Sequence, residues 1–568
     1  MATTTATGTR TIARLWQNAA VREPAATAYL VEQEDGWQAM SWEEAARAVD
    51  ELAHGLLALG IRKGDAFAIL ASTRVEWVLF DFALALVGGI TAPIYMNSSA
   101  RDAAYVVEHS EAVGILCEDD EQAAKVQGLA LEHVLTFDDF DELRARGREH
   151  AHTDPDAVER AAAEIGDEDL YTYIYTSGTT GPPKACMIRH RNYFSMVDTV
   201  RQVDDFTVED DVMLLYLPLA HNFGRCMALL GAHIGFTIAL CPDPYAVAEA
   251  LPAVRPTVFP SVPRVFEKMH TGVTQKFAEA TGIKRRLIEW ALRIGRRVSE
   301  LRQRDEPVPA LLAARHRLAD RLVYSKIKER MGGRVRIGVS GGAPLAQEII
   351  EFFHSLDILI LEGYGLTECT TAATVNRPSR FRFGSVGPAL PDAQLKIAAD
   401  GEVLIRSDTV FAGYFKDEEA TSEVMPGDGW LRSGDLGTLD DDGFLTITDR
   451  KKDILVTAGG KNVAPQNLEN ALKTHPAVSQ ALVVGDRRPY VAALITVAEG
   501  VDPDDARFEI EQVVEAVNSE LSRYEQIKRY AILPRDFTAE EDEVTPTLKL
   551  KRRVCQEHFA AEIEALYS

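Results

Sequence analysis

The stretch Tyr175-Thr176-Ser177-Gly178-Thr179-Thr180-Gly181-Pro182-Pro183-Lys184 follows an apolar run of aromatic and β-branched residues, 171–175. The run predicts a strand, and the stretch predicts a loop at its end. Glycines permit a tight turn and close approach of a ligand, hydroxyls and backbone N–H groups can donate to an anion, and Lys184 adds a positive charge. The pattern is typical of a phosphate-binding loop, although it is neither a Walker A sequence nor Gly-x-Gly-x-x-Gly. A surface turn is the alternative that spacing alone leaves open.

The composition is that of a soluble globular protein with room for a large core. The chain has 568 residues, 46% of them hydrophobic, and a formal net charge of −25. Sequence-general nucleic-acid binding relies on clustered Lys and Arg, so we expect no nucleic-acid partner. The six cysteines are scattered without a C-x-x-C pair, which argues against zinc sites and a disulfide framework and favours a reducing, cytoplasmic setting. No feature indicates an oligomeric state.

Two long apolar stretches are interrupted and therefore do not predict a membrane anchor. Asp81 and two glycines break the stretch 77–95, and Pro93 closes it, which favours a buried helix followed by a strand. The stretch 212–240 is broken in the same way by Pro218 and charged or polar residues. The first twenty residues lack the apolar core of a signal peptide, and we expect a frayed tail there.

Short apolar runs alternate with longer helical patterns through most of the chain. This alternation predicts an α/β fold with mostly parallel sheets flanked by helices, in which ligands bind beyond the carboxyl ends of the strands. Three loops that follow predicted strands, 176–184, 340–343 and 363–365, are therefore expected to meet at one crevice. The predicted strands are 66–70, 113–117, 171–175, 212–217, 236–241, 335–339 and 358–362.

The character of the chain changes at a charged joint, 449–453, which follows a turn-rich stretch. We predict a large N-terminal domain over 1–450 and a small, mobile α+β C-terminal domain over 451–568. The expected elements of the small domain are strands near 453–456, 481–484 and 491–497 and helices near 466–473 and 507–522.

A basic amphipathic helix is predicted over 283–301. Apolar residues recur every three or four positions, from Ile283 to Leu301. Between Lys284 and Arg304 eight Lys or Arg stand against two Glu. A solvated helix face explains this charge, and the alternative is weak peripheral attraction of the segment 283–304 to anionic lipid or to a phosphate-bearing substrate.

Four further motifs follow the phosphate-binding stretch in a fixed order. With them, the chain from about residue 25 to residue 560 resembles the AMP-forming adenylate-forming superfamily, which includes acyl-CoA synthetases, peptide-synthetase adenylation domains and luciferases. In that family a carboxylate attacks the α-phosphorus of ATP, so positive groups and a metal ion must offset the repulsion between anions. The motifs are Gly363-Tyr364-Gly365-Leu366-Thr367-Glu368, Gly429-Trp430-Leu431-Arg432-Ser433-Gly434-Asp435, Asp449-Arg450-Lys451-Lys452-Asp453 and Thr545-Pro546-Thr547-Leu548-Lys549-Leu550-Lys551-Arg552.

The resemblance implies a nucleotide site that holds ATP and Mg²⁺. Thr367 would contact the α-phosphate, and Glu368 would bind Mg²⁺ together with Thr176. Tyr364 would stack on adenine, with Gly341 and Gly342 leaving room for the base, and Asp435 and Arg450 would hold the ribose. The β- and γ-phosphates would be held by Thr176, Ser177, Gly178, Thr179, Thr180, Gly181 and Lys184.

The C-terminal domain would serve both half-reactions by rotating. Lys549 aligns with the lysine that bridges carboxylate and α-phosphate during adenylation, with Lys551 as an alternative register. Lys452 matches the hinge, and after rotation the loop carrying Gly459, Gly460 and Lys461 would face the site for thioester formation with coenzyme A.

Other positions refine the resemblance. His221 stands where relatives place an aromatic residue or His beside the acyl site, although a lone His is more often structural. Relatives usually have Gly after the phosphate-loop lysine, whereas this chain has Ala185, which is tolerated only at negative φ.

The helical insertion 283–331 and the form of the closing motif resemble long-chain fatty acyl-CoA synthetases. The resemblance implies a ligase that converts a long-chain fatty acid through acyl-AMP to acyl-CoA, releasing pyrophosphate and AMP. The alternatives are a fatty acyl-AMP ligase that loads a carrier protein, a ligase for a medium-chain or other carboxylic acid, and a non-catalytic binder of nucleotide or acyl-CoA. A cytoplasmic enzyme, peripheral at the inner membrane face if the basic helix binds lipid, fits these features.

Overall fold

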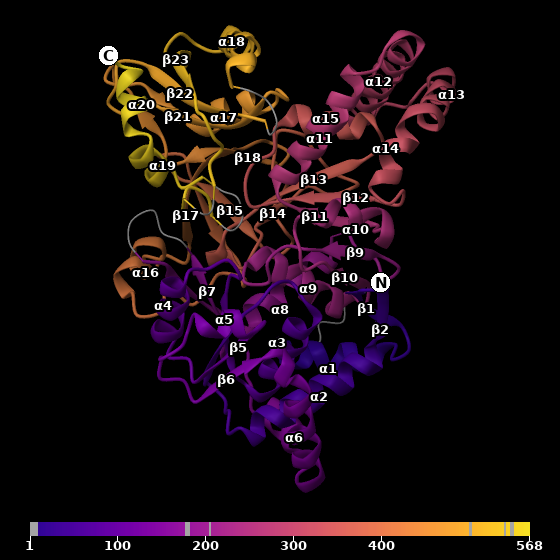
Figure 1. Cartoon of the computed structure of the whole chain (residues 1–568), viewed down its shortest axis with the longest axis vertical. Helices are drawn as coiled ribbons and strands as arrows, with labels where there is room; N and C mark the ends of the chain where they lie inside the picture. The colour runs from indigo at the N-terminus through magenta and orange to yellow at the C-terminus, as the bar shows by residue number, and fades with distance from the viewer. Residues whose placement is uncertain (1–8, 177–181, 204–205, 499–502, 539–540, 546–549) are drawn as a thin grey trace.

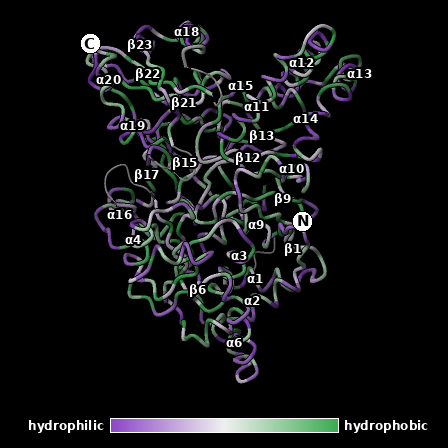
Figure 2. Tube along the Cα trace, viewed as in Figure 1, coloured by the Kyte–Doolittle hydropathy of each residue, from purple (hydrophilic) through white to green (hydrophobic). Residues whose placement is uncertain are grey.

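The computed structural model describes residues 9–176, 182–203, 206–498, 503–538, 541–545 and 550–568. Figure 1 shows a large body that contains the sheets, the C-terminal segment above it on the left and an arm of helices α12 and α13 above it on the right. In Figure 2 the trace around α6, at the foot of the molecule, is mostly hydrophilic. The alternation of helices and strands along the chain and the mostly parallel pairing in the two larger sheets confirm the predicted α/β class.

The first sheet has six strands and ends at the phosphate-binding stretch. Its strands β3, β4 and β5 are buried along their whole length, which explains their continuous apolar sequences. All neighbours pair parallel except the hairpin of β7 and β8. The strand order is β6 (His133–Thr136), β5 (Gly114–Cys117), β3 (Ala66–Leu70), β4 (Ile90–Ile94), β7 (Leu170–Thr176) and β8 (Lys184–Arg189).

The second sheet has eight strands, parallel in the middle and antiparallel at both edges. Its order is β14 (Thr374–Val375), β13 (Leu359–Tyr364), β12 (Ile337–Ser340), β11 (Val258–Ser261), β9 (Val212–Leu215), β10 (Thr237–Leu240), β1 (Thr27–Gln33) and β2 (Gly36–Ser41).

A third, antiparallel sheet precedes the charged joint, and the sequence did not predict it. β15 alternates exposed and half-buried positions, and β17 is buried only at Leu431, Asp435 and Gly437, so these strands lack the apolar runs that mark the parallel strands. Its order is β15 (Gln394–Ile397), β16 (Glu402–Arg406), β17 (Leu431–Leu439) and β18 (Leu445–Arg450).

Helices cover the sheets, and α3 with β4 confirms the expected buried helix and strand at 77–95. The expectation of a frayed tail over the first twenty residues is wrong for residues 12–20, because Ile12, Leu15 and Trp16 of α1 are buried in the main core. The helices are α1 (Ile12–Arg22), α2 (Trp42–Ala58), α3 (Val75–Val87), α4 (Ala100–Ser110), α5 (Asp120–Ala124), α6 (Phe140–Thr153), α7 (Ala157–Ala163), α8 (His190–Arg201), α9 (Asn222–Ile234), α10 (Val247–Val254), α11 (Pro263–Ala278), α15 (Gln347–Ser355) and α16 (Glu418–Val424).

The basic amphipathic helix is confirmed as α12 (Gly282–Gln303), which with α13 (Ala310–Ala319) and α14 (Ser325–Arg330) forms the arm. Its buried face agrees with the predicted one only in part. Val298 and Leu301 of the predicted apolar face are buried, whereas Ile283, also counted on that face, is 86% exposed near the start of the helix. Ile288 and Ala291 are buried although they were not counted. Within the described ranges, the structure contains no helix with the length and apolar content needed to cross a bilayer.

The C-terminal segment has the predicted α+β pattern and two hydrophobic clusters of its own, whose buried members all lie beyond residue 454. The division at 450 and 451 stays a prediction. The elements are β19 (Leu455–Val456), β20 (Asn462–Val463), α17 (Pro465–Lys473), β21 (Val478–Val484), β22 (Val491–Val497), α18 (Pro503–Ser519), β23 (Ile527–Ile532), α19 (Arg552–His558) and α20 (Ala560–Ala565).

Candidate functional site

Lys184 lies at the junction between the six-stranded sheet and the segment around Tyr414. Its ammonium group pairs with Asp417 at 3.1 Å and lies over the ring of Tyr414, 5.3 Å from the centroid. Ala185, the departure from the family pattern, has no positive φ, so the substitution fits the strand. The predicted phosphate contacts of Ser177, Gly178, Thr179, Thr180 and Gly181 lie outside the described residues.

Glu368, which follows a strand of the eight-stranded sheet, contacts Tyr414 as well. It belongs to a short 3₁₀ turn, Thr367–Cys369, that follows β13, and the Tyr414 hydroxyl donates to its Oε1 at 2.6 Å. Burial, and next the Glu368 carboxylate, raise the pKa of Tyr414, so its hydroxyl remains a donor. Tyr414 thus joins the phosphate-binding stretch to the predicted metal-binding turn, and no motif identified it.

Tyr364, Asp435 and Arg450 form a second group. The Tyr364 hydroxyl donates to Asp435 Oδ2 at 2.7 Å, and Arg450 Nε lies 3.4 Å from Asp435 Oδ1. Asp435 and Arg450 face each other in the register of β17 and β18. Burial, and next the Asp435 carboxylate, raise the pKa of Tyr364 well above its usual value. Three of the predicted adenine and ribose residues, Tyr364, Asp435 and Arg450, therefore lie together.

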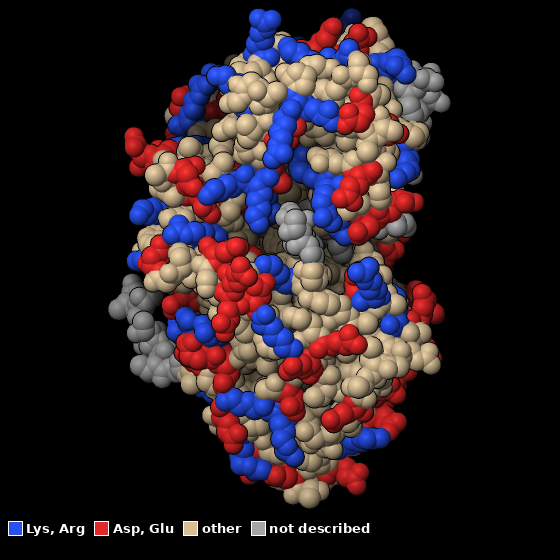
Figure 3. Space-filling view, turned by 90° about the vertical axis from the view of Figure 1, so that its left-hand side faces the viewer, with Lys and Arg blue, Asp and Glu red and all other residues tan. Residues whose placement is uncertain are grey.

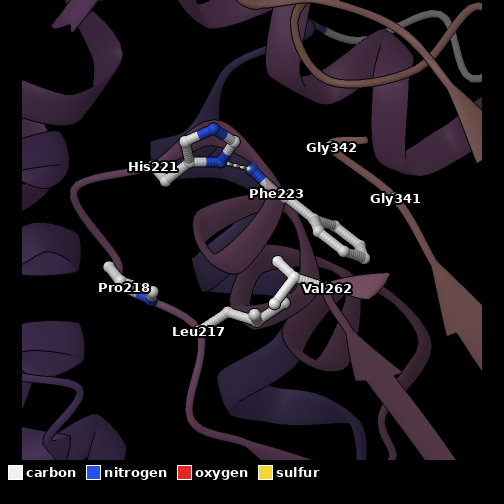
Figure 4. A pocket seen from close by; sticks show the side chains of 7 residues that line it. All are labelled: Leu217, Pro218, His221, Phe223, Val262, Gly341 and Gly342. Atoms are coloured by element: carbon white, nitrogen blue, oxygen red, sulfur yellow. Dashed lines mark hydrogen bonds between the residues drawn. The ribbon is translucent and has the colours of Figure 1, made fainter. Parts of the chain in front are cut away.

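A small pocket lies between the start of α9 and the residues that follow β9, β11 and β12 (Figure 4). His221 is the N-cap of α9, and its Nδ1 accepts from the Phe223 backbone N–H at 3.1 Å, so it has a structural role besides lining the pocket. A Cβ atom at Gly341 would lie 3.3 Å from the Phe223 ring, which explains why a small residue is needed there. The lining residues are Leu217, Pro218, His221, Phe223, Val262, Gly341 and Gly342.

The predicted residues of the C-terminal domain are placed only in part. Lys452 lies in the turn after β18, and Gly459 and Gly460 lie in the turn that joins β19 to β20, where Gly460 has φ of 71°. The Lys461 ammonium lies over the ring of Tyr524, 5.8 Å from its centroid. Lys549 lies outside the described residues, whereas the ammonium of Lys551, the alternative in register, pairs with Asp542.

The donor set suits a hard cation only in combination with phosphate oxygens. Within the described ranges, no three His, Cys, Asp or Glu side chains group closely enough to hold a metal ion. Glu368 offers a carboxylate that Tyr414 holds in place, and Thr176 has its hydroxyl 3.4 Å from the Lys184 carbonyl. Mg²⁺ is usually bound by one or two carboxylates plus substrate phosphates, so these residues fit the ion.

Figure 3 shows that the surface is hollowed between the upper and lower parts of the molecule, with Lys and Arg as well as Asp and Glu side chains at the border of the hollow.

Comparison with known proteins agrees with this geometry. A model of the AMP-binding enzyme family matches residues 16–415, and a model of its C-terminal domain matches residues 452–568. The chain belongs to the AMP-binding enzyme family. The long-chain-fatty-acid–CoA ligase FadD15 of Mycobacterium bovis is 40% identical to it, over 94% of this chain and 93% of that protein. The human long-chain-fatty-acid–CoA ligase ACSBG2 is 30% identical, over 94% of this chain and 88% of that protein.

A solved structure of an anthranilate CoA ligase, AuaEII, in complex with anthranoyl-AMP is similar to this AMP-binding enzyme with a TM-score of 0.77. The two chains are 20% identical, with 97% of this chain and 98% of that one covered. This similarity confirms the predicted fold, a large α/β domain followed by a smaller C-terminal one.

Proposed function

We propose that this AMP-binding enzyme is a long-chain-fatty-acid–CoA ligase. It would join a fatty acid to ATP as acyl-AMP, with loss of pyrophosphate, and then transfer the acyl group to coenzyme A with loss of AMP. The observation that carries the proposal is the joining of Lys184 and Glu368 through Tyr414, next to the Tyr364–Asp435 pair. The names of relatives that match nearly the whole chain support the fatty-acid substrate.

Each group has a chemical task in this proposal. Lys184 and its loop would hold the β- and γ-phosphates, Thr367 the α-phosphate, and Glu368 with Thr176 the Mg²⁺ ion that neutralises charge at the reacting phosphorus. Adenine would lie between Tyr364 and the glycines 341–342, with the ribose at Asp435 and Arg450. His221 would border the carboxylate end of the acyl chain, because it lines the pocket beside Gly341.

The C-terminal domain would supply the remaining groups. Lys549 would bridge the carboxylate and the α-phosphate in the first step. Rotation about Lys452 would then bring Gly459, Gly460 and Lys461 to the site for attack by coenzyme A.

Product analysis tests the proposal. Purified protein is incubated with ATP, Mg²⁺, coenzyme A and fatty acids from short to long chains, and acyl-AMP and acyl-CoA are measured by mass spectrometry. We expect acyl-CoA, with the highest yield at long chains. A maximum at medium chains would correct the substrate, acyl-AMP alone would favour transfer to a carrier protein, and neither product would contradict the function.

We also propose a cytoplasmic location with weak peripheral contact at the inner membrane face, through α12. All six cysteines are free and buried, as suits a reducing compartment. The eight basic side chains between Lys284 and Arg304 are exposed, and so are Ile283 and Leu311. Cationic charge beside exposed apolar residues is typical of binding to anionic lipid.

Sedimentation with vesicles tests this contact. We expect the protein to bind vesicles that contain anionic phospholipid at low salt and to be released at high salt. Reversal of charge at Arg286, Arg293 and Arg296 should abolish binding, and vesicles of neutral lipid serve as the control. Equal binding to neutral and anionic vesicles would contradict an electrostatic contact.

A further inference from the structure

Asn222 forms hydrogen bonds to both ends of the turn that carries Glu368. It is the first residue of α9 and is 1% exposed. Its Nδ2 donates to the Thr367 carbonyl at 3.2 Å, and its own carbonyl accepts from Thr371 Oγ1 at 3.1 Å. One buried residue therefore holds the backbone before Glu368 and the side chain three residues after it.

The turn needs such contacts because its backbone is strained. Thr370 and Thr371 have φ of 49° and 98°, a region that is costly for β-branched residues. The Thr370 hydroxyl donates to the Thr409 carbonyl at 2.6 Å, and the Thr371 hydroxyl donates to Asn222. A strained conformation persists only where its surroundings over-determine it, and such turns cluster at functional sites.

Asn222 is itself anchored in the core. The Tyr193 hydroxyl donates to its Oδ1. One turn further along α9, Arg225 is 1% exposed, forms an ion pair with Asp81 and donates to Thr172 Oγ1 at 2.6 Å. Since Thr172 belongs to β7, the first turn of α9 is attached to the strand that leads into the phosphate-binding stretch.

We propose that Asn222 is a positioning residue that fixes Glu368 relative to the phosphate-binding stretch, with the Asp81–Arg225 pair as its anchor. The inference rests on the proposed function, in which Glu368 binds Mg²⁺ and Thr367 contacts the α-phosphate. Asn222 would act through the turn, since it contacts Thr367 and Thr371 on either side of Glu368. Loss of groups that orient a metal-binding carboxylate typically costs about 10- to 100-fold in metal affinity or activity.

The test measures, by titration calorimetry on the full chain, how ATP binding depends on the Mg²⁺ concentration. In Asn222→Ala we expect the Mg²⁺ concentration for half-maximal effect to rise about tenfold or more, and kcat for acyl-AMP formation to fall by a similar factor. Tyr193→Phe keeps the ring but removes the donor to Asn222, and we expect a smaller shift in the same direction. It serves as the main variant if Asn222→Ala does not fold.

Asn376→Ala is the matched control. Asn376 is also buried, at 2% exposure, and bridges backbone groups: its Nδ2 donates to the Ser385 carbonyl at 2.7 Å and its Oδ1 accepts from the Arg382 N–H at 3.0 Å. We expect this variant to melt earlier with an unchanged Mg²⁺ dependence. An unchanged Mg²⁺ dependence in both Asn222→Ala and Tyr193→Phe, or an equal shift in the control, would overturn the inference.

Failure of the two proposals is distinguishable. A wild-type protein that yields neither acyl-AMP nor acyl-CoA would contradict the proposed function, whereas the calorimetric titration still measures whether Asn222 governs Mg²⁺ binding with ATP.

Discussion

Lys549 and Lys551 stand two residues apart in the closing motif, and their side chains are expected to differ in role. Lys551 is partly exposed and its ammonium pairs with Asp542, so its charge already has a partner within the C-terminal segment.

We expect Lys549→Ala to lower the rate of acyl-AMP formation on the order of 100-fold or more with little change in ATP binding, because a charge that acts only in the transition state is lost. Lys551→Ala is the control and should stay within about threefold, as expected for loss of an exposed ion pair. Stopped-flow or radiolabel measurement of acyl-AMP checks this, and the reverse ranking would show that Lys551 occupies the family position.

Residues inside ordered motifs could be predicted, including the Tyr364 and Arg450 partners of Asp435, whereas partners that lie outside the motifs could not. Glu368 and Asp435 were named from the motifs that contain them, and the structure places each beside a tyrosine. Tyr414 and Asn222 lie outside every motif, because a hydrogen bond between distant segments leaves no spacing in the sequence. His221, Gly341 and Gly342 of the pocket were named from the sequence, whereas Phe223, two residues after His221, was not.

At the scale of single elements, β13 carries a buried acid that makes stability depend on pH. Glu362 is 7% exposed and accepts from the Leu345 N–H at 3.1 Å, and burial raises its pKa to about 7. The folded chain thus binds this proton more tightly than the unfolded chain does, so the free energy of unfolding falls as pH rises from about 4.5 to 7. The difference corresponds to about 3 kcal/mol as an upper value.

The substitution Glu362→Gln should remove the fall in the free energy of unfolding that the deprotonation of Glu362 causes as pH rises. We expect the variant to gain stability relative to the wild type between pH 5 and pH 8, measured by urea unfolding at both values. Glu348→Gln, an exposed acid on α15, is the control and should leave the pH dependence unchanged. If the wild type instead gained stability relative to Glu362→Gln as pH rises from 5 to 8, the predicted direction of the pH dependence would be wrong.

The elements that could be predicted are those whose environment is uniform along their length. The parallel strands are buried on both faces and read as continuous apolar runs, and α12 has one buried face with a helical period. The antiparallel sheet of β15 to β18 was missed, since β15 has no buried position, β17 is buried at only three of its nine positions, and neither strand is a continuous apolar run. Ile283 was wrongly placed on the buried face because apolar spacing does not show which turns of a helix are packed. The first turn of α12 is exposed, and its first buried residue is Ile288.

At the scale of the whole molecule, two bodies with separate cores follow from the sequence, whereas the contacts between them do not. Such contacts depend on surface side chains with no periodicity. In the structure α11 meets the C-terminal segment: Arg264 donates to the Ser479 carbonyl at 2.5 Å and to its hydroxyl at 2.6 Å, and Lys473 lies 3.2 Å from Glu267. We name these four residues the α11 contact.

The α11 contact should favour the orientation seen here over the rotated one. The loop 458–461, which the proposed rotation would bring to the nucleotide site, is exposed in this orientation. Rotation about Lys452 would have to break the α11 contact, whose hydrogen bonds from a charged donor contribute about 1.5 to 3 kcal/mol each. Loosening the contact therefore makes the present orientation less populated and the rotated one more populated.

Arg264→Ala should slow acyl-AMP formation relative to thioester formation, changing the ratio of the two rates by about tenfold, which corresponds to about 1.4 kcal/mol. The two half-reactions are measured separately, the second from supplied acyl-AMP and coenzyme A. Arg302→Ala removes a charged-donor hydrogen bond of similar length, 2.6 Å to Asp357, that lies wholly within the large body, and the ratio should not change in this control. If Arg264→Ala slows both half-reactions equally, the contact stabilises the fold without selecting an orientation, because only a difference between the two orientations can alter the ratio.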